Sequence, residues 1–200
     1  QGPKSQEIIK SFTRSNDSIP EKPNDICKFT FEGLPALAIA KSLTGEEGCV
    51  LAFQTESEDT ITKKLLELEQ QNLLTHIDHH AREVFRIEAG IPSYGKDIND
   101  KNILPETGLE HSSVSYNKGC YIGQEVIARI KTYGAPNFAL MGLTIEGDVL
   151  PISGSEIKLA SKKLGVIKSS IFSYSLQKNI SLAYIQKDHR SPDIDLDVTI

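Results

Sequence analysis

The spacing of apolar residues changes character along the chain. Up to residue 133, stretches of helical periodicity alternate with short apolar runs, which is typical of a mixed α and β domain. This pattern predicts helices over 57–70, 81–89 and 126–131, and strands over 27–31, 37–40, 49–53 and 73–77. The stretch Tyr133-Gly134-Ala135-Pro136 then breaks the pattern, so we expect a domain boundary there.

Beyond this break the chain consists of short apolar stretches set off by Gly, Pro, Asn and Asp. They predict strands over 140–145, 156–159, 164–171, 180–185 and 195–200. In the last of these, Leu196, Val198 and Ile200 alternate onto one face. The spacing is typical of a small antiparallel barrel. We therefore expect an α+β domain over 1–136 and a C-terminal β-barrel over 137–200.

The net charge, the apolar runs and the cysteines limit which kinds of partner and metal site the sequence predicts. A net charge of −5 argues against a general grip on nucleic-acid backbone, so no direct nucleic-acid partner is expected. The chain shows neither an apolar run of membrane-spanning length nor a leader-like start, which favours a cytoplasmic protein without a membrane partner. Its three cysteines, Cys27, Cys49 and Cys120, form no C-x-x-C pair, so their spacing encodes no metal or cluster site.

The octapeptide from Lys118 to Glu125, K-G-C-Y-I-G-Q-E, joins a long irregular loop to a predicted helix. Gly119 and Gly123 permit a tight turn and a close approach of the backbone to a neighbour. Cys120 follows a cation and precedes a helix N-terminus, and both features favour the thiolate over the thiol. The alternative is a small buried apolar residue, which is the usual state of a lone cysteine.

Two further stretches carry candidate binding residues. Glu46 lies in the acidic turn Thr44-Gly45-Glu46-Glu47-Gly48, which could also be an ordinary solvated hairpin loop. Arg86 and Tyr94 lie in the block R-I-E-A-G-I-P-S-Y-G. The simplest interpretation is that Arg86 forms a surface ion pair with a neighbour on its helix.

Taken together, these stretches resemble a known family. The octapeptide resembles the K-G-C-Y-x-G-Q-E signature of the YgfZ family, folate-binding proteins tied to iron–sulfur cluster assembly and repair. Their sister family is the aminomethyltransferase (T-protein) of the glycine cleavage system. The opening Q-G-P-K, the T-G-E turn, the R-x-E-A-G…Y-G block and the strand at 165–170 resemble elements of these families in the same order.

The resemblance implies a tetrahydrofolate-binding protein that supports iron–sulfur enzymes. It favours a protein that is not itself an enzyme and leaves a folate-dependent transferase as the alternative. Its partners would be the folate and iron–sulfur client or assembly proteins, with an indirect link to tRNA modification. Cys120 and Lys118 would be the functional pair of the signature. The residues implied to bind the folate are Glu46, Arg86, Tyr94 and Gln124. A carboxylate suits the N–H donors of the pterin, and Arg and Tyr offer a bidentate grip and a flat ring.

The alternative is an aminomethyltransferase that passes a one-carbon unit to tetrahydrofolate. By resemblance, T-proteins share the surroundings of Glu46, Arg86 and Tyr94 but lack the cysteine of the signature. Their catalytic aspartate belongs to an N-terminal portion that we expect to be missing here, because Q-G-P-K stands inside the family's sequences. A third possibility is a scaffold that acts only through protein contacts.

Overall fold

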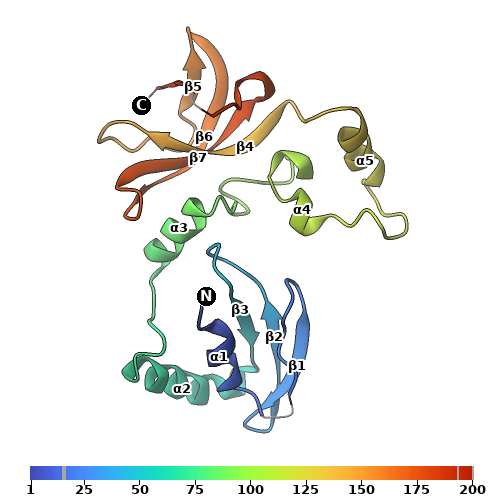
Figure 1. The fold of residues 1–200 in the computed structure, drawn as a ribbon, viewed down its shortest axis with the longest axis vertical. Helices are drawn as coiled ribbons and strands as arrows, with labels where there is room; N and C mark the ends of the chain where they lie inside the picture. Colours follow the sequence, from blue (N-terminus) through green and yellow to red (C-terminus); the bar gives the residue numbers. More distant parts are fainter. Residues whose placement is uncertain (15–16, 193, 200) are drawn as a thin grey trace. The chain divides into compact units, whose positions relative to one another are not determined.

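A computed structural model describes residues 1–14, 17–192 and 194–199, with only the backbone of Tyr133. The chain divides into two compact units, Gln1–Phe85 and Arg86–Ile200, and the division falls within helix α3 (Figure 1). Each unit is described by itself below. This division differs from the boundary expected after residue 136, which stays a prediction.

The first unit is an α+β unit built on a three-stranded antiparallel sheet in the order β1-β2-β3. Glu32 and Gly33 form the two-residue turn between β1 and β2, and both have positive φ, as the favoured hairpin turns require. The elements of the unit are α1 (Ser5–Lys10), β1 (Ile26–Phe31), β2 (Leu34–Ala40), β3 (Cys49–Ala52), η1 (Thr55–Ser57), α2 (Glu58–Gln70) and α3 (His79–Glu88). Three of the four predicted strands and both predicted helices of this region are confirmed. The strand expected over 73–77 is wrong, because these residues, which the structure describes, form no strand.

The core of this unit is a cluster of aromatic and aliphatic side chains from helix and sheet. Phe12 of the segment after α1 packs against Phe31 and Phe53 at centroid distances of 5.7 and 5.9 Å. Leu68 of α2 is buried against the same cluster. Large rings bury much apolar area each, so this small sheet obtains a core from few residues.

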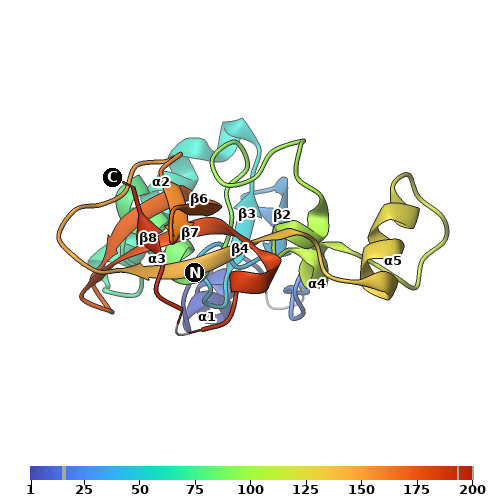
Figure 2. The ribbon, with the colours of Figure 1, turned by 90° about the horizontal axis from the view of Figure 1, so that it is seen from above.

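The second unit carries a five-stranded antiparallel sheet in the order β4-β7-β6-β5-β8. Figure 2 labels four of its strands, β4, β6, β7 and β8. Its elements are η2 (Leu104–Glu106), α4 (Glu110–Ser113), α5 (Gln124–Tyr133), β4 (Phe138–Ile145), β5 (Glu156–Leu159), β6 (Lys162–Ser173), β7 (Lys178–Gln186), η3 (Lys187–His189) and β8 (Asp197–Val198). The five predicted strands are confirmed, although Ile200, expected in the last strand, lies outside the described residues. The predicted helix at 126–131 is α5, which contacts η2 to one side of the sheet.

The centre of the sheet is closely packed on both sides. On one side, Ile157, Ile167 and Ile185 are at most 1% exposed and form the core. Gly165 lets β6 approach β7, because a Cβ there would lie 2.2 Å from the carbonyl oxygen of Tyr184. Among the described residues, no helix is long and apolar enough to cross a membrane.

Candidate functional site

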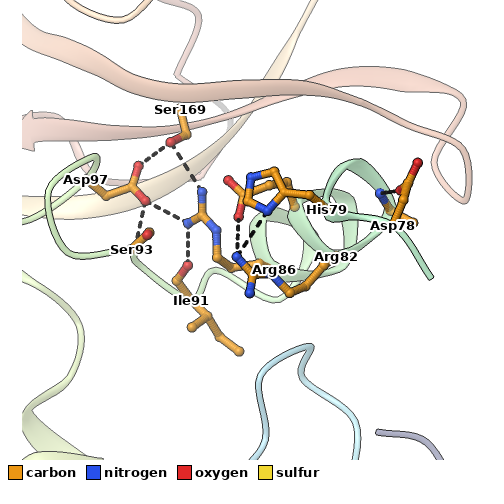
Figure 3. Close-up of polar contacts among 10 residues, drawn as sticks. Asp78, His79, Arg82, Arg86, Ile91, Ser93, Asp97 and Ser169 are labelled. Atoms are coloured by element: carbon orange, nitrogen blue, oxygen red, sulfur yellow. Dashed lines mark hydrogen bonds and ion pairs between the residues drawn. The ribbon is translucent and has the colours of Figure 1, made fainter. Parts of the chain in front are cut away.

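Arg86, near the end of α3, is the most deeply placed of the expected site residues (Figure 3). Its Nη1 donates to the carbonyl oxygen of Ile91 at 2.7 Å and to Oδ2 of Asp97 at 2.6 Å. The side chains of Arg86 and Asp97 are 7% and 0% exposed. The simple reading of Arg86 as a surface ion pair is therefore wrong, because its guanidinium group is buried against a carboxylate.

Asp97 is the centre of this buried cluster. Its Oδ2 also accepts a hydrogen bond from the backbone N–H of Ser93 at 2.8 Å, and its Oδ1 accepts one from Ser169 Oγ at 2.5 Å. Ser169 further accepts from Arg86 Nη2 at 3.4 Å. The carboxylate is thus surrounded by a cation and two hydrogen-bond donors, which offset the cost of taking its charge out of water.

Tyr94 lies on the turn 91–98, which also carries Ser93 and Asp97 of this cluster. The residue is 74% exposed, although the backbone just before it is hydrogen-bonded to buried groups, at Ile91 O and at the N–H of Ser93. Within the turn, the N–H of Asp97 donates to Ser93 O at 2.9 Å and the N–H of Gly95 donates to Ile98 O at 2.8 Å. The structure therefore presents an aromatic ring to solvent from a closely held backbone.

Glu46 is exposed on the acidic turn of the first unit. The N-terminal residues hold this turn: Gln1 Oε1 accepts from the N–H of Leu43 at 2.8 Å, and the N–H of Gly2 donates to Glu47 O at 2.7 Å. A Cβ on Gly48 would lie 2.1 Å from the end of the Gln1 side chain and would displace it from this position. The turn is thus a built structure whose carboxylate faces solvent.

The octapeptide lies in the second unit and is largely at the surface. Cys120 and Lys118 are exposed, whereas Cys27 and Cys49 are partly buried, so Cys120 is not a core residue. Lys118 Nζ lies 4.8 Å from the centre of the Tyr121 ring. Gln124 is the first residue of α5 and is partly exposed. The reactivity of the thiol stays a prediction.

The structure brings Arg86 and Tyr94 into one local arrangement, within ten residues of chain. Glu46 belongs to the other compact unit, so the expectation that it shares one surface with Arg86, Tyr94 and Cys120 stays a prediction. Sequence reasoning missed Asp97 and Ser169. The available signals were an acidic residue three positions after Tyr94 and a pair of serines that follow Lys168 within a predicted strand.

Tyr184 is a buried tyrosine whose pKa is affected by the charge of Asp97. Burial is the main cause that raises the pKa of Tyr184 to about 12, and the charges of Glu106 and Asp97 raise it further. The Tyr184 hydroxyl has no hydrogen-bond partner among the residues that the structure describes. The phenol therefore stays protonated at neutral pH.

Two family models match the chain. The model described as "GCVT N-terminal domain" covers residues 1–118, and the "Glycine cleavage T-protein C-terminal barrel domain" covers residues 139–200. The solved structure titled "Crystal structure of glycine cleavage system aminomethyltransferase T from Bartonella henselae" covers 100% of this chain with a TM-score of 0.81. At 18% identity, this likeness concerns the fold.

Curated relatives match at higher identity. Proteins named aminomethyltransferase from Symbiobacterium thermophilum and Caldanaerobacter subterraneus are each 30% identical over 100% of this chain. The chain covers 54% and 53% of these proteins, so it spans about half their length. Their name is that of an enzyme, which contradicts the expectation that the protein is not an enzyme.

Proposed function

Because the chain belongs to the GCVT family, whose N-terminal domain model it matches over residues 1–118, we propose that it is the folate-holding part of an aminomethyltransferase. One observation carries the proposal: both T-protein domain models match, in order, a chain that aligns over its whole length with relatives of that name. The reaction would transfer a one-carbon unit to tetrahydrofolate.

In this proposal, the exposed groups of the two built turns bind the folate. The Glu46 carboxylate accepts hydrogen bonds from neighbouring N–H groups of the pterin, and the ring of Tyr94 stacks on a flat part of the molecule. Arg86, which is buried with Asp97, acts from beneath the Tyr94 turn. Gln124 offers a partly exposed amide at the start of α5, with both donor and acceptor atoms.

The test uses the full-length protein and its matched variants. Titration with tetrahydrofolate should show binding that Glu46→Gln weakens by about 1.5 to 3 kcal/mol, the scale of a hydrogen bond to a charged group. Glu47→Gln is the matched control, since Glu47 is an equally exposed carboxylate on the same turn. Equal effects of the two substitutions, or no binding by the wild type, would contradict the proposed role of Glu46.

A second candidate function is favoured by one observation, the exposed thiol of Cys120 within K-G-C-Y-I-G-Q-E. In a folate-binding factor of the YgfZ type, this thiol and Lys118 would serve the maturation or repair of iron–sulfur enzymes. Replacement of Cys120 by Ala in cells should then lower the activity of iron–sulfur enzymes. Cys27→Ala is the control, and equal activity in both strains would exclude this function.

A further inference from the structure

The buried ion pair of Arg86 and Asp97 needs a physical reason. Bringing two charges out of water costs several kcal/mol for each ion, and an apolar pair of similar volume is often no less stable. The carboxylate of Asp97 is nonetheless 0% exposed and is bonded to groups from three segments: α3, the turn 91–98 and strand β6. Such a pair adds orientation rather than much stability.

What the pair orients is the turn that carries Tyr94. Arg86 binds the carbonyl oxygen of Ile91 before the tyrosine, and Asp97 binds the N–H of Ser93 next to it (Figure 3). Asp97 is itself the third residue after Tyr94 and is bonded to Ser169 in the sheet. The backbone before the exposed ring is therefore bound by the carboxylate–guanidinium pair, and the backbone after it leads directly to Asp97, a member of that pair.

The anchor in the sheet comes from an irregularity in β6. The register between β6 and β7 shifts between Ile167 and Ser169, as at a β-bulge. A bulge re-aims side chains locally, and here Ser169 Oγ lies 2.5 Å from Asp97 Oδ1. The turn is thus fixed to strand β6 of the sheet.

We propose that Asp97 is a positioning residue for folate binding: with Ser169 it holds the turn 91–98 so that its backbone presents the Tyr94 ring for stacking on a planar heteroaromatic ring. This inference rests on the proposed function and deepens it. A ring carried on a fixed turn costs less backbone ordering when a ligand stacks on it than a ring on a mobile loop does.

The experiment is a double-mutant cycle on tetrahydrofolate affinity in the full-length protein. Tyr94→Ala should weaken binding about tenfold, the scale of an aromatic stacking contact. Ser169→Ala removes one bond to Asp97 and leaves the ion pair, and should weaken binding about threefold, within the range of one hydrogen bond. In the Tyr94→Ala background, Ser169→Ala should have no further effect, because the two act through the same ring.

The matched control is Ser173→Ala. Ser173 Oγ donates to Glu88 Oε1 at 2.6 Å, so it also joins the end of α3 to β6 by a hydroxyl–carboxylate bond, but away from the Tyr94 turn. It should leave the affinity unchanged while lowering the melting temperature as Ser169→Ala does. Asp97→Asn, which keeps the shape and removes the charge, should weaken binding more than Ser169→Ala if it folds.

Three outcomes would overturn the inference while leaving the proposed function intact. These are an unchanged affinity in Ser169→Ala, an equal loss with and without Tyr94, and an equal loss in Ser173→Ala. A wild-type protein that does not bind tetrahydrofolate would overturn the proposed function and, with it, this inference. Coupling between Ser169 and Tyr94 supports both.

Discussion

The second unit contains two exposed segments built in opposite ways, the Tyr94 turn (91–98) and the Cys120 segment (115–125). The first is fixed from beneath by Asp97, whose side chain is 0% exposed. In the second, residues 115–120 are all exposed, and its contacts are surface ones such as Lys118 over Tyr121. Stacking on a ring requires a fixed orientation, whereas thiol chemistry requires access to the sulfur. The difference therefore separates a binding surface from a reactive position.

The largest expected effect is on stability. Asp97→Ala should lower the free energy of unfolding by about 3 to 5 kcal/mol, because it leaves the Arg86 charge buried without its carboxylate. Glu125→Ala, which removes the exposed pair with Arg129 from the Cys120 segment, should change it little. Denaturant unfolding of the two variants measures both. Comparable losses would show that burial does not distinguish the two segments.

A smaller loss of stability is expected when alanine replaces a closely packed glycine than when Asp97 is removed. Gly165→Ala places a Cβ 2.2 Å from the backbone oxygen of Tyr184 in the sheet that anchors the Tyr94 turn. We expect a loss of about 1 to 3 kcal/mol, as for other overpacked cores. Gly119→Ala, in the Cys120 segment, meets no atom within 4 Å. Thermal unfolding should therefore give a lower melting temperature for Gly165→Ala than for Gly119→Ala. Equal melting temperatures would contradict the close packing of β6 and β7.

The thiol of Cys120 should react faster than the partly buried thiol of Cys49. Burial raises the pKa of the Cys49 thiol, so this residue has both less thiolate and less access at neutral pH. Cys120 should be alkylated about tenfold faster or more in the folded protein, a difference of about 1.4 kcal/mol. Mass spectrometry of peptides after timed exposure to iodoacetamide gives each rate. Equal rates would place Cys120 in a protected environment.

The smallest expected effect is a pH dependence of stability that comes from Glu156, the first residue of β5. Hydrogen bonds from Lys163 and then Lys158 lower the pKa of Glu156 below its ordinary value of 4.5. Because the folded-state pKa is lowered, the contribution to stability is present above pH 4.5 and is lost as the pH falls through the folded-state value. Glu156→Gln should thus lower the melting temperature slightly at pH 7, and the difference from the wild type should shrink as the pH falls below 4.5. A difference that grows on acidification would reverse this sign.

Much of the fold follows from local patterns, and the candidate site does not. The strands of the second unit were predictable because each alternates apolar residues between turn formers, and α2 because its apolar residues recur at helical spacing. The bond between Asp97 and Ser169 joins residues 72 positions apart, so only the folded chain reveals it. Arg86 illustrates the same limit: its helix predicts a surface position, and a carboxylate outside the helix makes it a buried one.

The proposed function is measured directly as transfer of a labelled one-carbon unit to tetrahydrofolate by the full-length protein, with Tyr94→Ala and Cys120→Ala measured beside it. We expect transfer by the wild type, a loss of about tenfold in kcat/KM for Tyr94→Ala through weaker stacking, and little change for Cys120→Ala. Tetrahydrofolate binding without any transfer, or transfer that depends on Cys120 and not on Tyr94, would contradict the proposed function.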